Sequence, residues 1–205
     1  IPFNGSARGS AHAYLSSQSN CEFVACGRGI RESMRALLGG VNDDEWVYWC
    51  IDDRYPTWLD RDYLRAVIDV LPHLPEDVEE VKLLKWKEIL TDRVFEIGGQ
   101  PFNVQADGQY WGYWHHRPVR ARVLRRILLS EELAEGCSIN DIQTLLLTSA
   151  ERRVTGRALV PSRNIIKLAE PLVDRQLTRN GVDDLIRFGC EIPPYEVSQR
   201  KVAFT

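Results

Sequence analysis

The sequence predicts an α/β fold, because segments typical of buried strands alternate with helical segments over the first 90 residues. The strand-like segments are Cys21 to Gly27, Trp46 to Ile51 and Val81 to Lys87. Helical spacing of apolar residues fills 29–40 and 60–71, which lie between them. The order strand, helix, strand, helix, strand is typical of a sheet with parallel crossover connections.

The two predicted helices have clear boundaries. The first presents one apolar face and stops at Gly39-Gly40. Asp60 can cap the second helix, and Pro72 ends it. The apolar residues at helical spacing are Ile30, Met34, Leu37 and Leu38 in the first helix and Tyr63, Leu64, Val67, Ile68 and Leu71 in the second.

The second half of the chain predicts an α+β arrangement. Gly98-Gly99 and Asp107-Gly108 are turn signals between short strand-like pieces. Helical patterns follow at 119–129, from Ser138 through Leu147, and from Asn180 to a stop at Gly189. Since no linker or repeat interrupts the sequence, we expect a single domain, 1–205, with a nucleotide- and metal-binding half (1–90) and an acceptor-side half (91–205).

The composition is that of an ordinary globular protein. Its 205 residues are 44% hydrophobic and 27% charged, and the formal net charge of −3 argues against a general nucleic-acid binder. No apolar run approaches the roughly 18 residues of a membrane span, and the N-terminal stretch is not a signal peptide, so we expect a cytoplasmic protein. The chain opens without Met, which is compatible with a processed or truncated fragment. The five scattered cysteines favour reduced, structural thiols.

The segment WVYWCIDDRYP (46–56) carries the strongest functional signal. Ligands of open α/β sheets bind at the carboxyl ends of strands, where Asp52 and Asp53 would lie. Carboxylate oxygens suit Mg²⁺ or Mn²⁺. Because adjacent side chains on a strand point to opposite faces, one acid would bind the metal while the other holds a sugar hydroxyl or an arginine. The alternative is a turn in which the acids pair with Arg54 or Arg61.

The order of these segments resembles the glycosyltransferases of the GT-A fold, in particular bacterial and viral enzymes of surface-polysaccharide biosynthesis. The resemblance rests on IRESMRALLGGV, DDEWVYWCIDDRYP, the capped helix that follows, and VEEVKLLKW. ARVLRRILL and QLTRNGVDDLIRFGCEIP add to it further along the chain. It spans Tyr14 to Pro193, with its specific part at Arg31 to Trp86. In this sequence the two acids are adjacent and Tyr-Pro follows them, which departs from the family pattern.

The resemblance implies a GT-A-like mixed sheet flanked by helices and the transfer of a sugar from a nucleotide-sugar donor. The acceptor would be a saccharide or a lipid-linked saccharide, and the cofactor Mn²⁺ or Mg²⁺. Asp52 and Asp53 would hold the metal and the donor. Tyr14 and Ser16 would lie near the nucleotide base. Arg28 or Arg31 would offset the diphosphate charge.

An inverting glycosyl transfer needs a carboxylate that takes the proton of the acceptor hydroxyl. The resemblance points to Asp141 for this role, with Glu135 in reserve, and Asp53 also belongs to the predicted catalytic group. The alternative for Asp141 is structural, because Ser138-x-x-Asp141 is a capping box.

Three further features of the second half have two readings each. His115 and His116 could contact phosphate, with His115 as a metal ligand, or lie on the surface. The aromatic rings of QYWGYWHH could stack on a sugar or pack in the core. The five arginines between Arg117 and Arg126 could approach an anionic saccharide or make peripheral membrane contact, or form a solvated helix face.

Two other functional classes remain open at the level of sequence. A degenerate α/β module that binds a saccharide or a protein is favoured by the missing first strand of the GT-A pattern and opposed by the intact acidic strand end. A metal-dependent nuclease would need a further carboxylate and a lysine, and no spacing in the sequence supplies them.

Overall fold

The structure is a computed structural model of the chain, and not every residue in it is described. The described residues are 2–3, 24–25, 29–50, 55–85, 90–105, 116–133, 137–148, 156–169, 172–173, 176–187, 189, 192 and 194–198.

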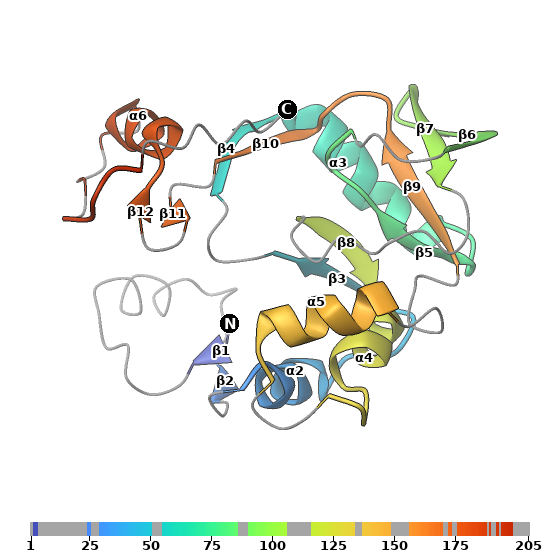
Figure 1. Cartoon of the computed structure of the whole chain (residues 1–205). Helices are drawn as coiled ribbons and strands as arrows, with labels where there is room; N and C mark the ends of the chain where they lie inside the picture. The colour runs from blue at the N-terminus through green and yellow to red at the C-terminus, as the bar shows by residue number, and fades with distance from the viewer. Residues whose placement is uncertain are drawn as a thin grey trace. The chain divides into compact units, whose positions relative to one another are not determined.

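The chain divides into two compact units. The first comprises Ile1–Val47, Asp107–Tyr113 and Val119–Gly156. The second comprises Tyr48–Ala106, Trp114–Pro118 and Arg157–Thr205. Figure 1 labels the helices and strands along the chain.

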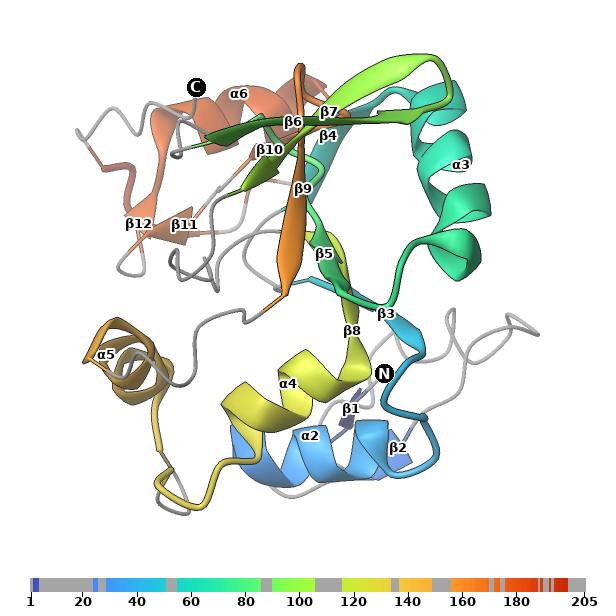
Figure 2. The ribbon, with the colours of Figure 1, turned by 90° about the vertical axis from the view of Figure 1, so that its right-hand side faces the viewer.

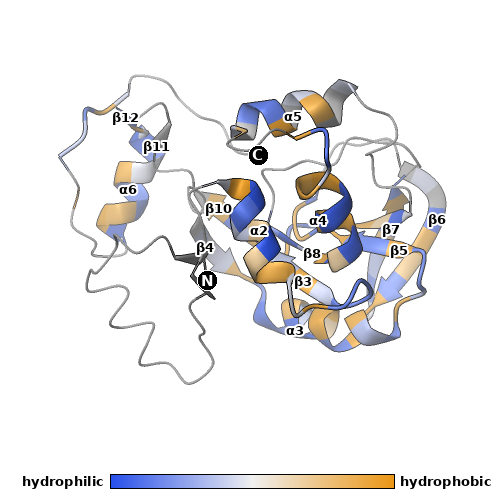
Figure 3. Ribbon diagram, turned by 90° about the horizontal axis from the view of Figure 1, so that it is seen from below, coloured by the Kyte–Doolittle hydropathy of each residue, from blue (hydrophilic) through white to orange (hydrophobic). Residues whose placement is uncertain are grey.

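The described part of the first unit contains three helices and a short parallel strand pair. Helix α2 contacts α4, and α4 contacts α5. Strands β1 and β2 pair in parallel. Figure 3 shows apolar and polar residues in alternating bands along α4, whose apolar residues are buried. These elements are β1 (Pro2–Phe3), β2 (Val24–Ala25), α2 (Ile30–Leu38), α4 (Ala121–Leu128) and α5 (Ile139–Thr148).

The largest sheet has six strands in the order β3-β8-β5-β9-β7-β6. It is mixed, because β5 and β9 are parallel whereas β7 is antiparallel to both β9 and β6. Figure 2 shows β5, β9 and the β6–β7 hairpin together. The strands are β3 (Trp46–Trp49), β5 (Val78–Val81), β6 (Leu90–Ile97), β7 (Gln100–Gln105), β8 (Arg117–Arg120) and β9 (Arg157–Pro161).

Helix α3 (Arg61–Val70) packs against the hairpin in the second unit. Asp60 caps it as predicted, because the side chain accepts a hydrogen bond of 3.0 Å from the Tyr63 amide. The buried Tyr63 ring meets Phe102 of β7 edge to face, at 5.5 Å between centroids. A 3-10 turn, η1 (Leu71–His73), follows the helix.

The remaining elements of the second unit are two antiparallel strand pairs and a helix. Strand β4 pairs with β10, β11 pairs with β12, and α6 contacts β10. Thr178 begins α6 by accepting a hydrogen bond of 2.9 Å from the Gly181 amide. The elements are β4 (Tyr55–Leu59), β10 (Ile166–Ala169), β11 (Leu172–Val173), β12 (Gln176–Leu177) and α6 (Arg179–Arg187).

The structure confirms the mixed α/β class, with two corrections to the predicted strands. The prediction of a strand at Val81 to Lys87 is wrong, because the strand is β5 and ends at Val81. Leu83 lies beyond the end of the strand but is still buried. Its carbonyl accepts hydrogen bonds from the Ile165 and Ile166 amides, so the buried backbone oxygen has partners outside a strand. The described part of the first predicted strand, Val24–Ala25, pairs with β1 in a two-stranded sheet of its own.

Candidate functional site

The predicted metal and donor residues Asp52 and Asp53 lie outside the described residues. Their flanks are described on both sides. Strand β3 ends at Trp49, three residues before Asp52, and β4 begins at Tyr55, two residues after Asp53. Five other predicted site residues also lie outside the described residues: Tyr14, Ser16, Arg28, His115 and Glu135. So do the aromatic residues at 110–114.

A buried ion pair joins β5 to β8 in the second unit. Nη1 of Arg117 lies 3.0 Å from Oε1 of Glu80, and the two side chains are 0% and 1% exposed. Burying a carboxylate and a guanidinium removes both from water at a cost of several kcal/mol per ion, so each needs its partner to remain charged there. Such pairs are uncommon in cores, and this one lies in the sheet that contains β3.

A second polar pair joins the residue before β8 to β3. Oη of Tyr48 lies 3.3 Å from Nδ1 of the buried His116, and the two rings meet edge to face with centroids 6.0 Å apart. Partial burial, with a smaller contribution from Cys50, raises the pKa of Tyr48 to about 12. The phenol is therefore neutral at physiological pH and keeps its proton for hydrogen bonding.

Glu80, His116 and Arg117, which are buried, and Tyr48, which is 48% exposed, form what we call the buried polar cluster. They come from β3, β5 and the start of β8, which are neighbours in the sheet. The cluster fixes the last residues of β3, the strand that runs into Asp52 and Asp53. Buried ionisable groups concentrate at functional sites, although structural ion pairs also occur.

Sequence reasoning missed the acidic part of this cluster. The signal was VEEV at 78–81, where two glutamates stand between valines and all four residues are buried. Of the predicted histidine pair, the described His116 is buried and not on the surface.

Arg31, the predicted diphosphate ligand, has a structural role in the first unit. Its Nη1 donates a hydrogen bond of 2.7 Å to the carbonyl of Leu133, which follows α4. The side chain is half-buried on α2. This contact ties α2 to the turn after α4 and occupies one of the guanidinium donors that a diphosphate would need.

Asp141, the predicted base, forms the capping box that the sequence indicated as its alternative role. Its Oδ2 accepts hydrogen bonds of 2.7 Å from both the amide and the hydroxyl of Ser138. The Asp141 amide donates to the Ser138 hydroxyl in return, at 3.2 Å. The Ser138 hydroxyl, and then its amide, lower the pKa of this exposed carboxyl. A lowered pKa weakens a general base, and the catalytic role of Asp141 stays a prediction.

The arginines of 117–126 do not form a simple solvated face, because four of them contact the chain itself. Arg117 is in the buried polar cluster. Arg120 donates to the Asp44 carbonyl and lies 4.4 Å from the centre of the Trp46 ring. Arg122 and Arg125 form ion pairs with Asp44 and Asp43. The charge that the sequence suggested for anionic lipid or saccharide is therefore largely balanced within the protein.

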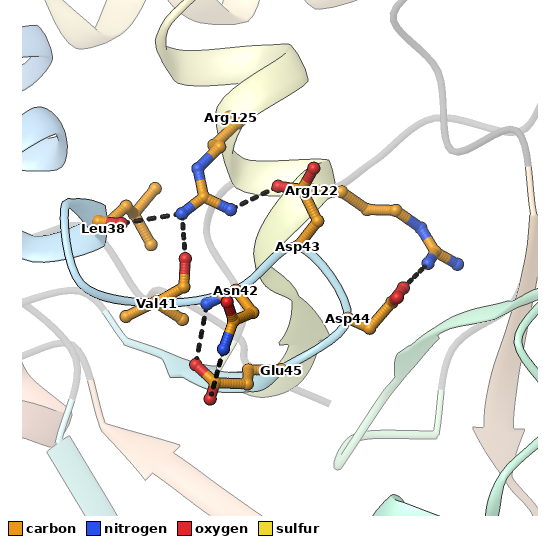
Figure 4. A network of polar contacts seen from close by, with 8 residues as sticks. All are labelled: Leu38, Val41, Asn42, Asp43, Asp44, Glu45, Arg122 and Arg125. Atoms are coloured by element: carbon orange, nitrogen blue, oxygen red, sulfur yellow. Dashed lines mark hydrogen bonds and ion pairs between the residues drawn. The ribbon is translucent and has the colours of Figure 1, made fainter.

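Arg125 holds the loop that connects α2 to β3 (Figure 4). Its Nη2 donates a hydrogen bond of 2.7 Å to the Leu38 carbonyl and another to the Val41 carbonyl, while Nη1 bonds Asp43. Figure 4 also shows Asn42 bonded to Glu45 within this loop. One guanidinium thus donates to the carbonyl of the last residue of α2 and to a carbonyl of the loop that follows it.

We expect Arg125→Ala to lower the free energy of unfolding by about 1–2 kcal/mol, because charged hydrogen bonds to two backbone carbonyls are lost. The ion pair with the exposed Asp43 adds little. Arg125→Lys keeps the charge without the forked geometry and should recover only part of the loss. Urea denaturation measures the change. Arg65→Ala, on the exposed side of α3, is the matched control and should stay within about 0.5 kcal/mol of wild type. An equal loss in both variants would contradict the role of Arg125.

No metal cluster is found in the part of the chain that the structure describes. Within those ranges, no group of three or more His, Cys, Asp or Glu side chains lies close enough to hold an ion. Because Asp52, Asp53 and His115 fall outside them, their predicted role as ligands is untouched by this result. Neither Cys50 nor Cys137 forms a disulfide, and the other three cysteines lie outside the described residues.

Comparisons with known proteins give no relatives. No protein-family model, curated protein or solved structure matches the chain. Among the described helices, none combines the length and the apolar character needed to cross a membrane.

Proposed function

We propose that the chain is a GT-A-like glycosyltransferase whose donor site is built on Asp52 and Asp53. The observation that carries the proposal is the position of β3. It belongs to a six-stranded mixed sheet, ends three residues before Asp52, and contains the partner of a buried histidine. Ligands of open α/β sheets bind at the carboxyl ends of strands, and this supports a donor site on the two acids that follow β3 in the sequence.

The donor set suits a hard divalent cation. Asp52 and Asp53 offer carboxylate oxygens, the ligands that Mn²⁺ and Mg²⁺ prefer, and the diphosphate of the donor would complete the shell. When bound, the cation would supply positive charge to the departing diphosphate. Because the two acids are adjacent, one would bind the ion while the other binds a hydroxyl of the donor.

The reaction would break the bond between the anomeric carbon and the diphosphate oxygen and form one to the acceptor hydroxyl oxygen. The nucleoside diphosphate leaves, and the proton of the hydroxyl passes to a base. Asp141 remains the sequence prediction for that base, but its capping box means that the proposal rests on the donor site alone.

Calorimetric titration tests the donor site. UDP, GDP, CDP and ADP are titrated with and without Mn²⁺ into wild type, Asp53→Asn and Asp69→Asn. We expect one nucleotide to bind only with Mn²⁺ and to lose at least about tenfold in affinity, or about 1.4 kcal/mol, in Asp53→Asn.

Asp69→Asn is the matched control, because Asp69 is an exposed acid on α3 and should leave binding unchanged. Circular dichroism verifies that each variant is folded. If no nucleotide binds to the folded protein, or if Asp53→Asn binds as tightly as wild type, the donor site is wrong. The saccharide- or protein-binding module then becomes the better description.

A further inference from the structure

Strand β4, which begins two residues after Asp53, presents an exposed aromatic surface. Trp58 is 44% exposed, although it belongs to a strand pair with β10, whose register shifts between Lys167 and Leu168. Pro56, two residues earlier, is exposed as well. A single exposed apolar residue needs no explanation. The neighbours of Trp58 therefore decide whether its exposure indicates a binding surface.

The neighbour of Trp58 across the strand pair is a lysine. Lys167 of β10 is the register partner of Trp58, and its Nζ lies 5.6 Å from the centre of the indole ring. Lys167 is exposed, and no ion pair joins it to any carboxylate among the described residues. The surface therefore combines an aromatic face with a positive charge that forms no ion pair with the carboxylates the structure describes.

The strand pair that carries this surface is firmly held. Thr57 donates to the Lys167 carbonyl at 3.3 Å, and the Asp60 amide donates to the Ile165 carbonyl at 2.9 Å. Beyond the strand end, Arg163 forms an ion pair of 2.7 Å with Asp60. A ligand that stacks on Trp58 would thus meet a preorganised ring, and little ordering of the backbone would oppose binding.

From these observations we infer that Trp58 and Lys167 bind a saccharide that carries a carboxylate, as the acceptor subsite of the enzyme. The indole face would cover the C–H groups of a pyranose ring, and the Lys167 ammonium would attract the acid group. The choice of a saccharide rests on the proposed function. Trp58 is five positions after Asp53, so their Cα atoms lie at most about 18 Å apart, within reach of a short oligosaccharide.

The experiment uses protein labelled with 5-fluorotryptophan and fluorine NMR, with calorimetric titration for variants that lack Trp58. Cellobiouronic acid and neutral cellobiose are titrated separately, without nucleotide or metal, and the Trp58 resonance is assigned from Trp58→Phe. We expect the acidic disaccharide to shift that resonance and to bind about threefold more tightly than cellobiose at low salt. In calorimetry, Trp58→Ala should bind at least about tenfold more weakly than wild type. Lys167→Gln should bind the two disaccharides with equal affinity, because the positive charge that favours the acidic one is removed.

Tyr195→Ala is the matched control, because Tyr195 is another exposed aromatic residue of the second unit, and it should bind as wild type does. The inference is overturned if neither disaccharide shifts the Trp58 resonance, if Trp58→Ala binds equally well, or if wild type binds both sugars equally. Nucleotide binding without a saccharide response would overturn this subsite alone. A saccharide response without nucleotide binding would overturn the donor site alone.

Discussion

Arg117→Met is expected to lower the free energy of unfolding by about 3–5 kcal/mol, the largest effect of any single change considered for this protein. The substitution leaves Glu80 as a buried carboxylate without its cation. Methionine matches much of the volume of arginine, so the loss reflects the uncompensated charge and not a cavity. Urea denaturation followed by circular dichroism measures the change.

A second variant separates charge from packing. Glu80→Leu combined with Arg117→Met removes both charges and should recover more than half of the loss, because well-packed apolar residues often replace a buried pair at little cost. Arg93→Met, on the exposed side of β6, controls for the loss of an arginine and should stay within about 0.5 kcal/mol of wild type. If the double variant is less stable than Arg117→Met, the buried-pair interpretation fails.

Gly98→Ala should lower the free energy of unfolding by about 2–5 kcal/mol, since two penalties coincide at this position of the β6–β7 hairpin. The residue has φ of +57°, which costs an L-residue about 1–2 kcal/mol. A methyl group added here would also lie 2.6 Å from Cβ of Ala66 on α3. That contact forces the helix and the hairpin apart, and overpacking of this kind costs about 1–3 kcal/mol.

The next residue provides the control for Gly98. Gly99 has φ of +72° but open space around it, so Gly99→Ala should show the conformational penalty alone. The difference in unfolding free energy between the two variants measures the clash. Adding Ala66→Gly to Gly98→Ala should remove the clash, apart from the roughly 1 kcal/mol that glycine costs inside a helix. Equal losses in Gly98→Ala and Gly99→Ala would show that α3 does not press on the turn.

The parts of the fold that local chemistry determines were predictable from the sequence. The cap at Asp60, the Gly98-Gly99 turn and the helical periodicity around Met34 each depend on a few neighbouring residues, and the structure has all three. The Ser138–Asp141 capping box was also recognisable for the same reason.

Interactions between distant residues could not be predicted in this way. Nothing near Glu80 in the sequence indicates Arg117 as its partner, and glutamates in a strand normally indicate exposure. The sequence around α4 suggested a basic surface, because Asp43 and Asp44, which pair with two of its arginines, are remote in sequence. The order of strands in the sheet could not be predicted for the same reason, because β8 lies between β3 and β5 although it follows both in the chain.

The link between Arg125 and Asp43 has a consequence for synthesis on the ribosome, because the two residues are 82 positions apart. At about 5–20 residues per second, the α2 end of this link is made about 4–16 s before the α4 end exists. During that interval α2, whose Met34 and Leu38 side chains are buried in the folded protein, lacks its contacts with α4. The first unit therefore completes late, after most of the second unit's sheet has been synthesised, and α2 is the segment that a chaperone would have to protect meanwhile.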